Sequence, residues 1–293
     1  MPTTTDIEPV SQTFEVPGAT ITYDLRPKPD SALAPLFMIG SPMGAAGFGT
    51  LAGHFTDRTV ITYDPRGVER SLKADVASPV DPTVHADDIH RVIEAAGLGS
   101  VDMFASSGGA VNALALVAAH PGDVRTLVAH EPPLGAVLPD SASALEVCRA
   151  VARTYQEKGF GYGMAHFIAV VSHDGEFSDD YAAQPGPDPE MFGMPSQDDG
   201  DRSDPLLGQN MITCTHFRPD FDALRSASTR VVVAAGVASG QTMASRTAHA
   251  LAERLGTGVV LFPSDHGGFL GGEYGQMGDP DAFAITLHEV LAG

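Results

Sequence analysis

The sequence of 293 residues contains no tryptophan, only two cysteines, and far fewer basic than acidic side chains. With 17 Lys and Arg against 37 Asp and Glu, its formal net charge is −20. A surface of this sign repels phosphate backbones and anionic lipids, so we expect neither a nucleic-acid partner nor a membrane partner. The cysteines, Cys148 and Cys214, form no CxxC pair, which argues against a zinc or redox motif and favours two buried thiols.

Long apolar runs and ligand-binding motifs are missing as well. No stretch reaches the roughly 18 consecutive apolar residues that a membrane-spanning helix needs. Residues 1–6 lack the basic region and apolar run of a signal peptide, so the expected location is the cytoplasm. Few lysines and abundant Ala, Gly, Asp and Arg suggest a bacterial source. GxGxxG, GxxxxGK[ST] and HExxH are all absent, so we expect no cofactor and no metal.

What is present is an alternation of short apolar runs with amphipathic segments. This pattern is typical of an α/β fold with a mostly parallel central sheet flanked by helices. Strands are expected at Thr13–Val16, Ala19–Leu25, Pro35–Ile39, Thr59–Tyr63, Val101–Ala105, Val124–His130, Arg230–Ala235 and Val259–Phe262. Helices are expected at Thr83–Ala96, Gly108–His120, Gln241–Leu255 and Pro280–Leu291.

The alternation breaks between residues 134 and 228, where strand signals nearly vanish. Two helical stretches, Ser141–Glu157 and Tyr162–Val171, precede an acidic, Pro- and Gly-rich run, Asp174–Asp204, that we expect to be a mobile or disordered loop. The sequence therefore predicts a discontinuous core, residues 1–133 and 229–293, interrupted by a helical cap or lid at 134–228. We call residues 134–228 the cap segment.

The most informative stretch joins the strand at Val101–Ala105 to the following helix through two serines and two glycines. A serine on such a sharp turn needs small residues two positions before and after it. Ala105 and Gly109 meet this condition for Ser107, whereas Ser106 would have Phe104 two positions before it. Ser107 would also lie at a helix N-terminus, where the Gly108 N–H can stabilise a developing oxyanion.

The segment Phe104–Ala110 resembles the nucleophile elbow of the α/β-hydrolase superfamily. Gly40–Phe48 is similar to that family's oxyanion loop, and Asp64–Ser71 to its D-x-R-G-x-G-x-S turn. The resemblance covers nearly all of the chain outside the cap segment. It implies the α/β-hydrolase fold, a serine nucleophile at Ser107, and the backbone N–H of Ser41 as second oxyanion donor beside that of Gly108. One departure is Ile39, where the family often has histidine.

His266 is the best candidate for the general base among the eleven histidines. It lies in the loop directly after the last expected strand, Val259–Phe262, and therefore at the carboxyl edge of the sheet with Ser107. The chain order, serine before histidine, agrees with the family. The remaining histidines lie mainly on predicted helices, where such side chains are usually solvated or packed.

The acid that would orient His266 is less obvious. Family members most often place this acid three residues after a glycine that ends the seventh strand of their sheet. Here the corresponding strand is Arg230–Ala235, and the residues after Gly236 are Val237-Ala238-Ser239, none of which is a carboxylate. Glu131 is the alternative, because it follows Val124–His130 directly and comes 24 residues after Ser107, as the glutamate of some haloalkane dehalogenases does. Asp265, or a dyad without an acid, remains open.

These residues predict a serine hydrolase that cleaves an ester, thioester or lactone of a small apolar substrate through a Ser107–His266–Glu131 triad and an acyl-enzyme. A rival is C–C bond hydrolysis of the meta-cleavage type, because Gly40–Phe48 also resembles the loop of those enzymes. A second rival is a non-catalytic homologue that binds a small ligand. Epoxide and haloalkane hydrolysis need a carboxylate nucleophile, so the serine at position 107 argues against both reactions. The sequence leaves the oligomeric state open, a homodimer included.

Overall fold

The computed structural model describes residues 8–76 and 78–293; the observation on residues 1–6 lies outside them. Within these ranges a nine-stranded sheet runs in the order β1-β2-β4-β3-β6-β7-β8-β9, with β5 added beside β2. From β4 to β9 neighbouring strands are parallel, and β1, β2 and β5 pair antiparallel. The strands are β1 (Val10–Val16), β2 (Ala19–Arg26), β3 (Leu36–Ile39), β4 (Val60–Tyr63), β5 (Leu72–Lys73), β6 (Val101–Ser106), β7 (Val124–His130), β8 (Arg230–Gly236) and β9 (Val259–Phe262).

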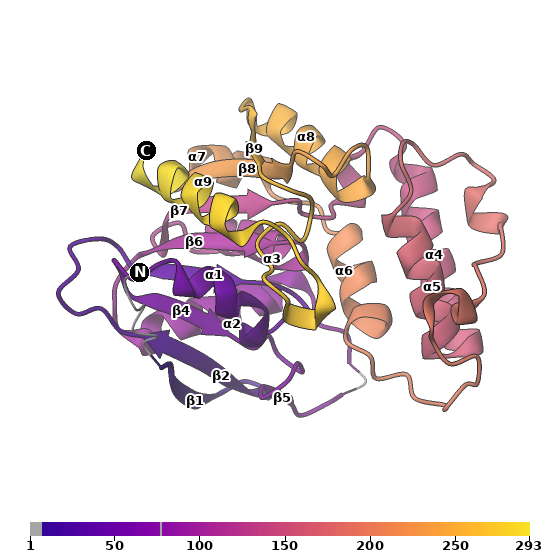
Figure 1. Ribbon diagram of the computed structural model, residues 1–293, viewed down its shortest axis with the longest axis horizontal. Helices are drawn as coiled ribbons and strands as arrows, with labels where there is room; N and C mark the ends of the chain where they lie inside the picture. Colours follow the sequence, from indigo (N-terminus) through magenta and orange to yellow (C-terminus); the bar gives the residue numbers. More distant parts are fainter. Residues whose placement is uncertain (1–7, 77) are drawn as a thin grey trace.

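Helices cover both faces of the sheet (Figure 1). One buried cluster joins the sheet to α2 (Pro82–Ala96), α3 (Gly108–Ala119) and α8 (Met243–Leu255), and a second joins it to α1 (Gly49–Gly53) and α9 (Pro280–Ala292). Successive residues of β3 alternate between them: Phe37 and Ile39 lie in the first cluster, Leu36 and Met38 in the second. Because both faces are buried, the central strands read as continuous apolar runs.

The cap segment lies beside the carboxyl ends of the central strands (Figure 1). It contains α4 (Ser141–Lys158), α5 (Phe160–Val171), a π-helical turn (Leu206–Asn210), α6 (Met211–Thr215) and α7 (Phe221–Ser226). Most of these elements share a third buried cluster. Leu134 and Leu224, which lie near the two ends of the cap segment, pack instead into the first cluster, with α3. The boundaries 134 and 228 remain a prediction.

The fold class predicted from the sequence is confirmed, and each predicted strand is present within a few residues. The structure adds α1, β5, the π-helical turn, α6 and α7, which are too short to give a periodic pattern. Asp174–Asp204, the expected loop, contains two short 3-10 turns. Its Phe177 and Pro189 are buried against the rest of the cap segment. No helix in the described part of the chain is long and apolar enough to cross a bilayer.

Candidate active site

Ser107 lies on the tight turn between β6 and α3. Its φ of 56° and ψ of −128° fall in a region that non-glycine residues rarely adopt, so the turn holds its backbone under strain. The Ser107 N–H donates to the carbonyl of His130 at 3.0 Å, which ties the turn to the end of β7. Ser106 is buried, with its Oγ 3.2 Å from Nδ1 of His130, whereas Ser107 is partly exposed. Ser107 is therefore the serine that a substrate can reach.

The elbow is pressed against the loop that follows β3. A Cβ on Gly109 would lie 2.7 Å from the Ile39 carbonyl oxygen and 2.8 Å from the Cα of Gly40, and one on Gly108 would clash with the Ser41 carbonyl oxygen. Only glycines allow this approach, and it brings the backbone of Ser41 beside that of Gly108. The two predicted oxyanion residues are thus neighbours.

This contact gives a stability prediction. We expect Gly109→Ala to lower the free energy of unfolding by about 1–3 kcal/mol, because the new methyl group meets fixed backbone atoms rather than a flexible side chain. Gly122→Ala is the matched control, since nothing lies within 4 Å of its added Cβ. Urea unfolding of both variants measures the difference. Equal stabilities would contradict the close contact.

The loop after β3 is held from its other side by Asp64. The Ala45 N–H donates to Oδ1 of Asp64 at 2.8 Å, and Arg70 donates through Nε to Oδ2 at 2.6 Å. Arg70 also pairs with Asp24 on β2. Within the Asp64–Ser71 turn, the buried Asp64 carboxylate therefore holds the loop after β3, and Arg70 near the end of the turn holds that carboxylate. Arg66, the arginine of the D-x-R-G motif, pairs instead with Asp88 of α2.

Glu131 and His266 meet at the carboxyl edge of the sheet. Nδ1 of His266 lies 2.6 Å from Oε2 of Glu131, and the Gly236 N–H donates to Oε1 at 2.9 Å. Glu131 is fully buried, whereas the His266 side chain is 46% exposed. A proton on Nδ1 shared with the carboxylate leaves Nε2 unprotonated, which is the tautomer that a general base requires.

The end of β8 supports Glu131 instead of supplying an acid of its own. Gly236, after which the family usually places the acid, donates its N–H to Glu131, and its Cα lies against the backbone of Asp265. Burial raises the pKa of Glu131, but the hydrogen bond and the charge of His266 outweigh it and hold this pKa well below its ordinary value. Asp265, the alternative acid, accepts from the Gly267 N–H within its own loop.

Among the described residues, no direct hydrogen bond joins the side chains of Ser107 and His266. The structure thus pairs His266 with Glu131 and brings Ser107 to the same sheet edge through the bond to His130. Hydrogen bonds between a nucleophile and its base often tighten only when substrate is in place. The roles assigned to the three residues remain predictions.

His130 and Asn210 are site neighbours that the sequence did not single out. The His130 ring is buried beside that of His266, with centroids 5.9 Å apart. Burial lowers the pKa of His130 to about 4, so it adds no charge beneath the base at neutral pH. Asn210, at the end of the π-helical turn, accepts from the Ser41 Oγ at 3.2 Å. Only the adjacency of His130 to Glu131 was visible in the sequence; the 169-residue separation of Ser41 and Asn210 hid their contact.

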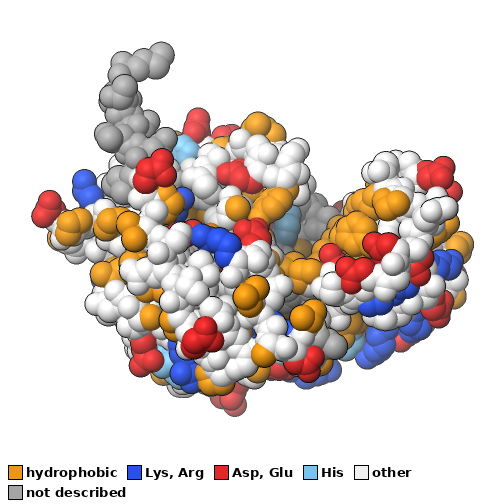
Figure 2. Space-filling view, turned by 90° about the horizontal axis from the view of Figure 1, so that it is seen from below, with side chains coloured by type: hydrophobic (Ala, Val, Ile, Leu, Met, Phe, Trp, Pro, Cys, Tyr) orange, Lys and Arg blue, Asp and Glu red, His pale blue; other side chains and the backbone are white. Residues whose placement is uncertain are grey.

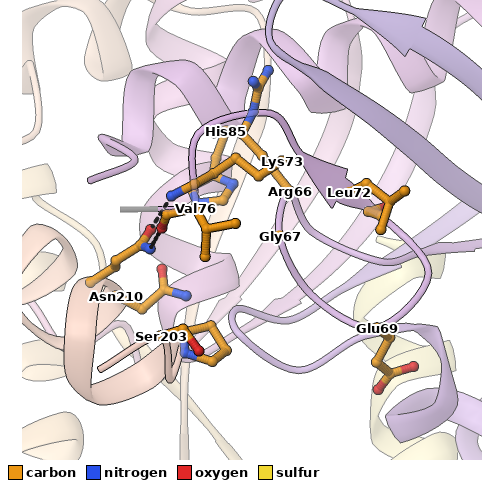
Figure 3. Close-up of a pocket in the computed structure, with 12 residues that line it drawn as sticks. Arg66, Gly67, Glu69, Leu72, Lys73, Val76, His85, Ser203 and Asn210 are labelled. Carbon is orange, nitrogen blue, oxygen red and sulfur yellow. Dashed lines mark hydrogen bonds between the residues drawn. The ribbon is translucent and has the colours of Figure 1, made fainter. Parts of the chain in front are cut away.

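Asn210 also lines a cavity of about 180 Å³ between the cap segment and the core (Figure 3). Lys73 and His85 face it from the core, and the Lys73 amine donates to Gln209 of the π-helical turn at 3.1 Å. The Gln209 amide in turn donates to the Val76 carbonyl at 3.2 Å. Figure 2 shows the surface hollowed between the core and the α4–α5 pair, with hydrophobic side chains along the hollow. Neither Ser107 nor His266 is among the described residues that line this cavity, so Asn210 is its link to the candidate site through Ser41.

Comparisons with known proteins agree with this architecture. The family model described as "alpha/beta hydrolase fold" matches residues 44–171. The chain is 28% identical over 262 residues to the uncharacterized hydrolase YraK of Bacillus subtilis, with 88% of this chain and 89% of that protein covered.

Solved structures extend the likeness over nearly all of the chain. A thermophilic esterase of Thermogutta terrifontis superposes with a TM-score of 0.64 at 18% identity, covering 97% of this chain and 98% of the esterase. The enol-lactonase of Burkholderia xenovorans gives 0.65 at 16% identity, covering 96% of this chain and 100% of that one. At these identities the likeness speaks for the fold alone. The chain has the α/β-hydrolase fold, and it resembles proteins of the α/β-hydrolase superfamily.

Proposed function

We propose that the protein is a serine hydrolase that cleaves an ester, thioester or lactone of a small apolar substrate. The observation that carries this proposal is the pairing of a buried glutamate, Glu131, with a half-exposed histidine, His266, at the sheet edge where Ser107 occupies a strained elbow. A structural ion pair needs no neighbouring strained serine, whereas a triad needs all three residues at one edge.

In the proposed mechanism, Nε2 of His266 takes the proton from the Ser107 hydroxyl as its oxygen attacks the substrate carbonyl. The backbone N–H groups of Ser41 and Gly108 stabilise the tetrahedral oxyanion. His266 then returns the proton to the leaving oxygen or sulfur, and an acyl-Ser107 remains. In the second half of the reaction, water deprotonated by His266 attacks this acyl group, and the bond to the Ser107 oxygen breaks as His266 returns the proton to that oxygen and the carboxylic acid leaves. Glu131 holds the ring and stabilises its positive charge in both halves.

The names of related proteins support the choice of bond. An esterase and an enol-lactonase are among the solved structures that this fold resembles, and both names denote cleavage at an ester carbonyl. As part of the same proposal, the protein acts in the cytoplasm and its main partner is a small-molecule substrate. The acidic surface agrees with this choice of partner.

A substrate panel tests this function. It contains p-nitrophenyl esters of graded acyl length, a thioester, a lactone and a dienolic ketone with a scissile C–C bond. We expect turnover of the short- and medium-chain esters. Turnover of the C–C substrate alone would replace ester hydrolysis by the rival reaction, and inactivity towards the whole panel would favour a non-catalytic binding protein.

The Ser41–Asn210 hydrogen bond gives a second prediction. We expect Asn210→Ala to lower kcat/KM for ester hydrolysis about 2- to 10-fold, because one buried hydrogen bond that positions the oxyanion loop is lost. Ser41→Ala removes the other end of the same bond and leaves the backbone N–H in place. The double variant should therefore lose no more than either single variant. Additive losses would mean that the two side chains act independently.

A further inference from the structure

Two histidines and an aspartate meet on the surface opposite the candidate active site. His90 lies in α2, His120 ends α3, and Asp123 immediately precedes β7. Because β6 and β7 are parallel, Asp123 marks the amino edge of the sheet, whereas Ser107 follows the carboxyl end of β6. The cluster is therefore separated from the elbow by the length of α3.

The three side chains form one compact group. The imidazole rings of His90 and His120 stack with their centroids 3.9 Å apart and their planes 9° apart. Nδ1 of His90 lies 2.7 Å from Oδ2 of Asp123, and one ligand atom from each residue lies within 4.8 Å of the other two. All three are half-buried, so a hydrated ion can reach them while the surrounding chain limits their motion.

We propose that His90, His120 and Asp123 bind a divalent transition-metal ion, with Zn²⁺ as the representative. Two imidazoles and a carboxylate are ligands that Zn²⁺ and its neighbours Co²⁺ and Ni²⁺ accept, with a water completing the coordination. Zinc–ligand bonds of about 2.0–2.2 Å place tetrahedral ligand atoms roughly 3.3 Å apart. Ligand atoms that lie up to 4.8 Å apart must therefore approach one another, whereas Nδ1 of His90 and Oδ2 of Asp123, 2.7 Å apart, must separate by roughly 0.6 Å. Side-chain rotations that splay the stacked rings can supply these movements.

The ion would take the place of the proton between His90 and Asp123. On binding, two neutral imidazoles and the carboxylate donate lone pairs to the metal, and the displaced proton passes to solvent. Glu94 adds a further carboxylate, 3.5 Å from Nε2 of His90. Arg91 beside His90 is engaged by Asp87, so this neighbouring cation already has its own counter-charge.

The local and overall fields both favour a cation here. His120 ends α3, where the unpaired carbonyls of the last turn carry partial negative charge. The net charge of −20 raises the concentration of cations at the whole surface. A metal bound here would link α2 to the α3–β7 turn and stabilise the fold without touching the reacting atoms.

Tag-free protein, freed of metal by a chelator, is titrated with ZnCl₂ and with CoCl₂. We expect the Tm to rise by about 5 °C or more at Zn²⁺ concentrations 100-fold above Kd, and Co²⁺ to give the visible absorption of tetrahedral coordination. His120→Gln should abolish both signals, and Asp123→Asn should weaken binding about tenfold or more. His54→Ala is the matched control, since His54 is another surface histidine beside a carboxylate, that of Asp281.

Binding weaker than about 1 mM, or binding that survives His120→Gln, would overturn the proposal. The Tm of His120→Gln without metal reports whether the variant is folded, and half-exposed His120 can be replaced without opening the core. Because every readout is independent of turnover, the outcome does not depend on the proposed hydrolase activity.

Discussion

Ser107→Ala is expected to lower kcat for ester hydrolysis by about three or more decades while leaving the fold intact. The reason is that Ser107 supplies the oxygen that forms the acyl-enzyme, and alanine has no group to replace it. The elbow's strained φ of 56° costs alanine no more than serine, so stability should change little. Steady-state kinetics on the best ester of the panel, with urea unfolding alongside, measures both quantities.

Ser106→Ala is the matched control for this variant. Ser106 precedes Ser107 but turns its hydroxyl into the core towards His130, so its loss should lower activity far less. If Ser106→Ala were the inactive variant and Ser107→Ala the active one, the assignment of the nucleophile would be wrong.

Glu131→Gln is expected to cost about two to four decades in kcat. Its amide can still accept from the Gly236 N–H, but the NH₂ group then faces Nδ1 of His266. Nδ1 must become the acceptor, which leaves the proton on Nε2 and removes the base that Ser107 needs. Kinetics of Glu131→Gln beside Asp265→Asn tests the choice of acid, since Asp265 caps its own loop and should be dispensable. If Glu131→Gln kept the wild-type rate, the acid that orients His266 would have to be another group.

The same pair makes stability depend on pH. The pKa of Glu131 falls from its ordinary 4.5 to about 2 because of His266, even though burial alone would raise it. A carboxyl group whose pKa is lowered by folding stabilises the protein fully at pH values above its pKa in the unfolded chain. This stabilisation is lost as the pH falls through the pKa of the folded state. The unfolding free energy of the wild type should therefore decrease between about pH 4.5 and pH 2, and Glu131→Gln should lack this component.

Much of the fold could be predicted because its signals are local. The bounds of β7 and β9 agree with the sequence prediction, since both are short apolar runs between turn residues. The prediction for α2 is within one residue, because Asp81 caps its first turn and Gly97 ends it. In contrast, β5 is two residues long and exists only because β2 offers it an edge.

The candidate site divides in the same way. The elbow needs small residues at fixed positions around Ser107, so it could be predicted from the sequence. The position of His266 after the last strand could be predicted in the same way. Glu131 could be selected only through its place after β7, and its contact with His266 spans 135 residues. Asn210 and the histidine–aspartate cluster gave no signal, because nothing in a single sequence records that a π-helical turn reaches Ser41 or that His90 stacks on His120.

The most direct test of the central claim is covalent labelling by a fluorophosphonate, followed by mass spectrometry of the intact protein and its peptides. An activated serine attacks phosphorus and keeps the phosphonyl group, whereas an ordinary hydroxyl does not react. The account predicts one adduct per chain, on Ser107, which disappears in Ser107→Ala and forms far more slowly in His266→Ala. A wild-type protein that stays unlabelled, or carries its adduct on another residue, would contradict it.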